Sequence, residues 1–232
     1  AGGSLWSEAR AGAAYVFRHR LLLGMALRPA VGNIAFMAGE GVMVLFAHDR
    51  LHISSSGFGL LLASQAVGGL LGSGLTGRVT AVMGTGTALT CTAVVEAIAL
   101  LGFALSPDAV VAGLSLAVLG AAMSVTMVLG ATLRQSIVPP ELIGRVTAVT
   151  RLMAVSAAPL GALLGGWLAT AEGLRAPYLT GAALLLAMTL VTATLTNNRR
   201  VEEALAGARA ATPPAESPSE ESPEQTPATA GA

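Results

Sequence analysis

Glu96 lies near the centre of a long apolar stretch, residues 87–105, and its carboxyl group could carry chemistry there. An ionised group at the middle of a lipid bilayer costs about 2.5–3.5 kcal/mol even on a lenient insertion scale. A carboxyl group at that depth either binds and releases a proton or supports the packing of its helix. Glu96 is therefore a candidate for a proton pathway, with a structural role as the alternative.

Three further polar residues lie on another apolar stretch, residues 21–47. A rise of about 1.5 Å per residue places Glu40 near the far end of this stretch. Glu40 is either a proton or cation site or a solvated helix end. Asn33, two turns earlier, is a candidate hydrogen-bonding group for a bound solute. Arg28 lies about two turns inside the stretch, where its long stem favours snorkelling toward the near end.

A mildly polar surface is predicted on the stretch 108–133. Thioether side chains adapt to irregular shapes, and hydroxyl groups beside them can hydrogen-bond. Together they would suit a bulky amphipathic solute, with plain helix packing as the alternative. The residues of this candidate pathway are Met123, Ser124, Thr126 and Met127.

Motifs of common enzyme chemistry are missing from the sequence. There is no phosphate-binding loop, dinucleotide fingerprint, paired-cysteine motif or nucleophile elbow. His48 and His52 flank Asp49 but lack a third strong ligand for a metal ion. The sequence therefore predicts a protein that is not an enzyme, with no catalytic residue, metal, cofactor or nucleic-acid partner.

Six apolar stretches must position these side chains. The chain is 53% hydrophobic and 11% charged, with a mean hydropathy of +0.70, whereas soluble domains carry about 25% charged residues. An apolar run of about 20 residues crosses a bilayer as a helix. The fold class is thus an all-α membrane protein with six transmembrane helices. The predicted spans are 21–47, 57–77, 87–105, 108–133, 147–170 and 177–196.

Arginine placement predicts the orientation of these spans. The chain has no lysine, and most arginines fall in alternate connections. Positively charged loops remain in the cytoplasm, so both ends are expected to be cytoplasmic, with the spans in the cell membrane. Arginines near this side are candidate cytoplasmic gate residues, and the one inside the fifth span is expected to bind carbonyls or a carboxylate. The gate candidates are Arg78, Arg134, Arg145 and Arg151.

Glycines recur at helix-packing spacing within two spans. Gly68 is followed by Gly72, and Gly161 by Gly165. Lipid offers no hydrophobic drive between helices, so close backbone approach through small residues is a main source of packing energy. These glycines are predicted to form packing seams, with hinges of a moving protein as the alternative.

The chain divides into three parts. Residues 1–20 form an amphipathic lead-in on the cytoplasmic side, and residues 21–196 form the transmembrane bundle. Residues 197–232 are predicted to be a cytoplasmic and largely disordered tail, with a short surface helix at 199–210. No initiator Met and no cleavable signal peptide are present, which indicates a piece that starts within a longer protein.

One connection carries a family resemblance. The sequence RQSIVPPELIGRV at residues 134–146 precedes Arg151 and the segment PLGALLGG at residues 159–166. Together these resemble the C-terminal half of major facilitator superfamily transporters, in particular the branch of macrolide efflux pumps and enterobactin exporters. The similarity covers about residues 8–196 and leaves the tail unexplained.

The resemblance implies six helices in two inverted three-helix repeats. It also implies alternating access, with a small-molecule substrate bound in the bilayer between this half and an N-terminal half absent here. Proton-driven efflux of a drug-like or siderophore-like molecule follows from the same branch. The third span of such a half usually supports the fold from outside the cavity, which favours a structural Glu96. The alternative is a non-transporting membrane scaffold that recruits partners through its tail.

Overall fold

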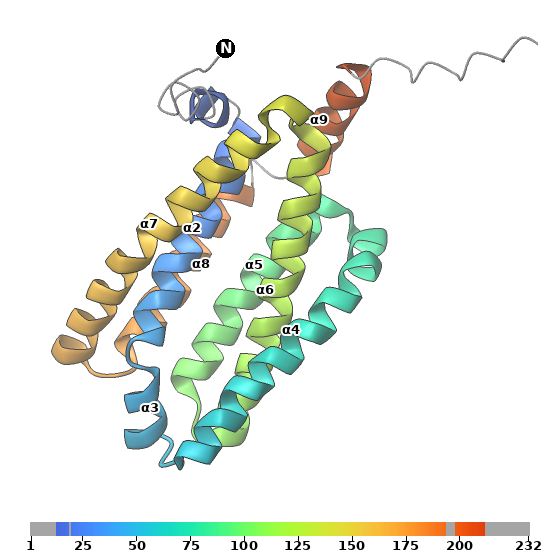
Figure 1. The fold of residues 1–232 in the computed structure, drawn as a ribbon. Coiled ribbons are helices and arrows are strands. Elements are labelled where there is room, and N and C mark those ends of the chain that lie inside the picture. Colours follow the sequence, from blue (N-terminus) through green and yellow to red (C-terminus); the bar gives the residue numbers. More distant parts are fainter. Residues whose placement is uncertain (1–12, 19, 194–197, 212–232) are drawn as a thin grey trace, which may run out of the picture.

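The computed structural model describes residues 13–18, 20–193 and 198–211, and within them it is helical without strands (Figure 1). Six of the helices are long and apolar enough to cross a membrane, namely α2 and α4 to α8. The expected disorder after residue 211 and most of the lead-in lie outside the described residues. The helices are α2 Arg20–Glu40, α3 Met43–Asp49, α4 Ser55–Met83, α5 Thr85–Leu105, α6 Ala109–Ile137, α7 Pro140–Glu172, α8 Ala176–Ala193 and α9 Asn198–Ala211.

The packing of the helices follows a pseudo-two-fold rule. The main pairs are α4 with α6, α2 with α7, α5 with α6, α5 with α8, and α2 with α8. The rule exchanges the first three long helices with the last three: α2 with α6, α4 with α7, and α5 with α8. Under this exchange the pair α4–α6 becomes α7–α2, and the pair α5–α6 becomes α8–α2. The pair α5–α8 remains the same. This pattern agrees with the expected pair of inverted three-helix repeats, and it places α4 and α7 on opposite flanks of the bundle (Figure 1).

The predicted glycine seams are confirmed on both flanks. A side chain at Gly68 or Gly72 of α4 would meet the backbone of α6 at Ala117 and Ala121, respectively. The symmetry-related pair in α7 meets α2, where a Cβ at Gly161 would lie 2.5 Å from the carbonyl oxygen of Ile34. Hydrogen in place of a side chain thus allows each outer helix to approach its inner partner at backbone distance.

The first predicted span, 21–47, is two helices and not one. α2 ends at Glu40 and α3 begins at Met43, because Gly39 and Gly41 weaken the helix at this point. Tyr178 of α8 packs against Gly39, and its hydroxyl group donates a hydrogen bond of 2.9 Å to the Gly39 carbonyl oxygen. The break is therefore held by a tertiary contact with α8.

An aromatic cluster fixes α3 against the bundle. Phe46 of α3 is fully buried, and its ring centroid lies 5.0 Å from that of Phe103 and 5.2 Å from that of Tyr178. Phe103 and Tyr178 meet edge to face at 5.0 Å. These three rings join α3, α5 and α8 at the end of the bundle opposite the α6–α7 connection.

Three helices extend well beyond their predicted spans. α4 continues to Met83 instead of ending at residue 77, α6 continues to Ile137 instead of residue 133, and α7 begins at Pro140 instead of residue 147. Arg78 and Arg145 therefore lie on helices and not in loops. Hydropathy marks only the part of a helix inside hydrocarbon, whereas the helical hydrogen bonds continue beyond it. Proline also suits the first helical position, where its missing N–H needs no partner.

The short helix predicted at residues 199–210 is present as α9, Asn198–Ala211. At the start of α9, the Asn198 side chain donates to the Met83 carbonyl oxygen at 3.0 Å and accepts from the Thr87 amide at 2.9 Å. It thereby closes the tight α4–α5 turn at Gly84, whose φ of +75° suits glycine. Val201 is buried in the same region, so α9 is anchored to the bundle.

We expect Asn198→Ala to destabilise the α4–α5 turn locally by about 1 kcal/mol, because one helix-capping contact and one carbonyl contact are lost. Hydrogen exchange of the amides at residues 85–87 should become about fivefold faster. Arg199→Ala is the control, since its pair with Glu203 is exposed to solvent. Unchanged exchange in Asn198→Ala would contradict this role.

Candidate functional site

A cavity of about 780 Å³ lies among five of the long helices. Its lining comes from α2 at 24–36, α5 at 89–100, α6 at 119–134, α7 at 147–154 and α8 at 185–192. The connection between α6 and α7 lies at one end of the bundle, and α2 begins at the same end (Figure 1). The lining therefore extends from the middle of the bundle toward that end.

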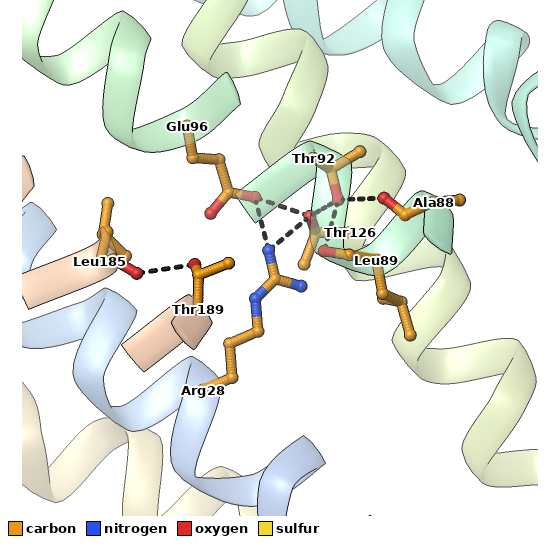
Figure 2. Close-up of polar contacts among 8 residues, drawn as sticks. All are labelled: Arg28, Ala88, Leu89, Thr92, Glu96, Thr126, Leu185 and Thr189. Carbon is orange, nitrogen blue, oxygen red and sulfur yellow. Dashed lines mark hydrogen bonds and ion pairs between the residues drawn. The ribbon is translucent and has the colours of Figure 1, made fainter. Parts of the chain in front are cut away.

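Three side chains of the cavity lining, Arg28, Glu96 and Thr126, form a polar network, whose contacts Figure 2 shows. The Arg28 guanidinium of α2 donates through Nη2 to Oε1 of Glu96 at 3.4 Å and to Oγ1 of Thr126 at 3.2 Å. The Thr126 hydroxyl of α6 donates to the same Glu96 oxygen at 2.6 Å. Its oxygen also lies 3.0 Å from that of Thr92, one turn before Glu96 on α5. One carboxyl oxygen thus accepts from α2 and from α6.

The Arg28–Glu96 pair is nearly buried, with side-chain exposures of 14% and 10%. Few waters can solvate either charge at this depth, so each stabilises the other. Removing one partner of a buried pair lowers the stability of a protein by about 3–5 kcal/mol, because the remaining charge is uncompensated. The separation of 3.4 Å is long for a charge-assisted hydrogen bond. The pair is therefore required for charge balance and yet is not tightly locked.

The structure corrects two interpretations from the sequence. Snorkelling of Arg28 toward the near end is wrong, because Glu96 and Thr126 hold its guanidinium inside the bundle. The expectation that the third span lies outside the cavity is also wrong. α5 contributes part of the lining, including Glu96, because α5 packs between α6 and α8.

The remaining pathway candidates lie as follows. Asn33 lines the cavity, and its Nδ2 donates to the Ala154 carbonyl oxygen of α7 at 2.8 Å. Glu40 is exposed at the other end of α2 and does not line the cavity. All four candidates of the α6 surface line it, namely Met123, Ser124, Thr126 and Met127.

The four gate candidates separate into two pairs. Arg134 and Arg151 line the cavity, whereas Arg78 and Arg145 do not. α7 begins seven residues before the predicted span, so Arg151 lies about three turns inside it. The expected bond from Arg151 to a carbonyl or carboxylate group is absent among the described residues.

Sequence reasoning missed Arg28 as the partner of Glu96, although a signal was present. Arg28 lies about 12 Å along α2 and Glu96 about 16 Å along α5 at 1.5 Å per residue, and both helices begin at the same end (Figure 1). Charges inside a membrane protein usually pair. Two opposite charges at similar depth could therefore have been matched.

Comparison with known proteins decides the family. The profile of the Major Facilitator Superfamily matches residues 3–228, which is nearly the whole chain. The chain belongs to the major facilitator superfamily. Its six apolar helices are accordingly those of a multi-pass membrane protein. No curated protein sequence matches this superfamily member.

A solved structure with the same fold is a proton:xylose symporter, XylE, bound to 6-bromo-6-deoxy-D-glucose. The match has a TM-score of 0.65 at 14% sequence identity and covers 86% of this chain. The present chain spans 52% of the length of that symporter. At this identity the likeness shows the fold alone.

Proposed function

We propose that the chain is the C-terminal half of a secondary active transporter and that an N-terminal six-helix half completes its substrate cavity. The observation that carries this proposal is the cavity itself, with a charged pair on its wall. Its volume of about 780 Å³ is within the usual range of about 300–1,000 Å³ for small-molecule sites. The chain matches about half of the symporter structure, which supports the proposal that a second half completes the transporter. Rocking of the two halves would expose the site alternately to each side of the membrane.

In this proposal Glu96 is the proton-coupling group. A carboxyl group that faces the cavity and is held by Arg28 and Thr126 is reachable by protons when the cavity is open to water. Protonation removes its charge and releases Arg28 from the pair. Such a change in the charge balance across α2, α5 and α6 can bias a conformational equilibrium.

The proposed cargo is a drug-like or siderophore-like molecule, carried outward in exchange for protons. The apolar and thioether side chains of the cavity suit an amphipathic body, and the RQSIVPPELIGRV segment favours an exporter. Arg78, Arg134 and Arg145 lie on α4, α6 and α7 next to the α4–α5 and α6–α7 connections, and these connections are at one end of the bundle (Figure 1). We propose that this end faces the cytoplasm of the cell, with both chain ends on that side.

The test expresses the full-length transporter in cells that lack their own efflux pumps. Cells with the transporter should accumulate severalfold less of at least one probe in a panel of fluorescent dyes that includes anions, such as pyrenebutyrate, as well as cations, such as Hoechst 33342. A proton uncoupler should restore accumulation. Equal accumulation across the panel, with and without the uncoupler, would overturn proton-driven efflux.

The scaffold alternative is tested by removing residues 212–232. This cut keeps α9, whose Asn198 and Val201 contact the bundle. A transporter should retain its dye efflux without these residues, whereas a scaffold should lose its partners and show no efflux in either form.

A further inference from the structure

The charged residues of the cavity do not balance. Three arginines line it, namely Arg28, Arg134 and Arg151, and Glu96 is the one carboxylate among its described lining residues. The lining therefore has a formal excess of two positive charges. An excess charge beside low-dielectric walls attracts ligands of the opposite sign.

The excess positive charge of the lining is carried by Arg134 and Arg151. Arg28 is compensated, because Glu96 lies 3.4 Å from its guanidinium. Arg134 and Arg151 have neither an ion pair nor a side-chain hydrogen bond with any described residue. Arg134 is half-buried on α6, and Arg151 on α7 is exposed. Their guanidinium donors, five N–H groups each, are available to a ligand in the cavity.

The two arginines line the same cavity from different helices, Arg134 from α6 and Arg151 from α7. These two helices make few direct contacts with each other. A carboxylate, sulfonate or phosphate group suits such donors because planar guanidinium groups bind oxyanions with two parallel hydrogen bonds.

The rest of the lining defines the body of the ligand. Apolar and thioether groups face the cavity at Phe36, Leu119, Met123 and Met127, among others. Such side chains bind an apolar body and offer no counter-charge.

We infer that the substrate is an amphipathic anion whose oxyanion group binds Arg134 and Arg151 while its apolar body contacts the α2 and α6 walls. This inference rests on the proposed function, because it names the substrate class of the same cavity. It excludes lipophilic cations as preferred cargo, since they would face two uncompensated arginines.

The experiment uses three fluorescent probes with one apolar body: pyrenebutyrate, its methyl ester, and pyrenebutyl-trimethylammonium. Binding to the purified full-length transporter in nanodiscs is measured by fluorescence titration. We expect pyrenebutyrate to bind about tenfold more tightly than the ester, and the ammonium probe to bind most weakly. Raised salt should weaken the binding of the anion selectively.

Variants connect this preference to the two arginines. Arg134→Gln and Arg151→Gln should each lose about tenfold in pyrenebutyrate affinity and keep the affinity for the ester, which also shows that the variant is folded. Arg134→Lys should retain part of the preference. Arg78→Gln is the matched control, because Arg78 lies near the same end of the bundle but outside the cavity lining.

Three outcomes would overturn the inference: equal binding of ester and anion, stronger binding of the ammonium probe, or unchanged anion affinity in both glutamine variants. A second assay measures transport of the same probes into proteoliposomes under a proton gradient. It distinguishes failure of the anion inference from failure of the proposed transport function. Movement of the ammonium probe would refute the anion preference and leave the transporter proposal intact. Anion binding without movement of any probe would refute transport alone.

Discussion

Glu96→Gln is expected to abolish the proposed proton-driven transport, with at least a tenfold loss of uncoupler-sensitive efflux. Glutamine has the shape of glutamate and can still accept a hydrogen bond from Thr126, but it neither binds a proton nor neutralises Arg28. Exchange of substrate across the membrane without a proton gradient should survive, because the apolar lining is unchanged. The two assays together separate loss of coupling from loss of the cavity.

Glu40→Gln is the matched control for this prediction. Glu40 is an exposed carboxylate at the other end of α2 and lies outside the cavity lining. Uncoupler-sensitive efflux should persist in this variant. If Glu96→Gln keeps normal coupling, or if Glu40→Gln abolishes it, the assignment of the proton site to Glu96 is wrong.

The same substitution has a stability consequence that a double-mutant cycle can measure. Glu96→Gln alone leaves the Arg28 charge uncompensated, and Arg28→Met alone does the same to the carboxylate. Each should lower the melting temperature of the purified protein in detergent. The double variant should be more stable than the sum of the two losses predicts, because it removes both charges. Additive losses would show that the two side chains do not interact.

The number of spans could be predicted from the sequence because it depends on a local property. About 20 apolar residues identify a membrane helix wherever it packs. The helix ends could not be predicted equally well. α4, α6 and α7 extend past hydrocarbon length, and hydropathy does not report a helix that continues beyond it.

The break between α2 and α3 depends on Tyr178, which lies 139 residues from Gly39 in sequence. The two glycines around Glu40 were visible, but glycines are also common inside transmembrane helices. Only the packing of α8 against α2 distinguishes a break from a continuous helix. That contact is tertiary, and the sequence does not reveal it.

The candidate site shows the same division. The Met and Thr side chains of α6 were candidates for a solute-binding surface from their types, with plain helix packing as the alternative, and they line the cavity. The similar depths of Arg28 and Glu96 made them possible partners, but deciding that they pair requires knowing that α2 and α5 both face the cavity. The depth of a charge along a helix can be counted from sequence, whereas the direction of its side chain cannot.

Gly68→Ala is expected to destabilise the protein although alanine is the better helix former. A Cβ at Gly68 would lie 2.6 Å from the carbonyl carbon and 2.7 Å from the Cα atom of Ala117, and at Gly72 it would meet Ala121 equally closely. Backbone atoms cannot rotate away as a side chain would, so α4 must move from α6. Overpacking of this kind costs about 1–3 kcal/mol per site.

Gly74→Ala on the same helix makes the test specific, because a Cβ there meets nothing within 4 Å. It gains helix propensity of about 1 kcal/mol without a clash, so its melting temperature should stay equal or rise. Gly68→Ala and Gly72→Ala should each melt several degrees lower, and the double variant should lose monodisperse behaviour in detergent. Equal melting of the Gly68 and Gly74 variants would show that the α4–α6 seam tolerates separation. The seam would then permit the small sliding movements that a hinge requires, and close packing would not be the reason for glycine at these positions.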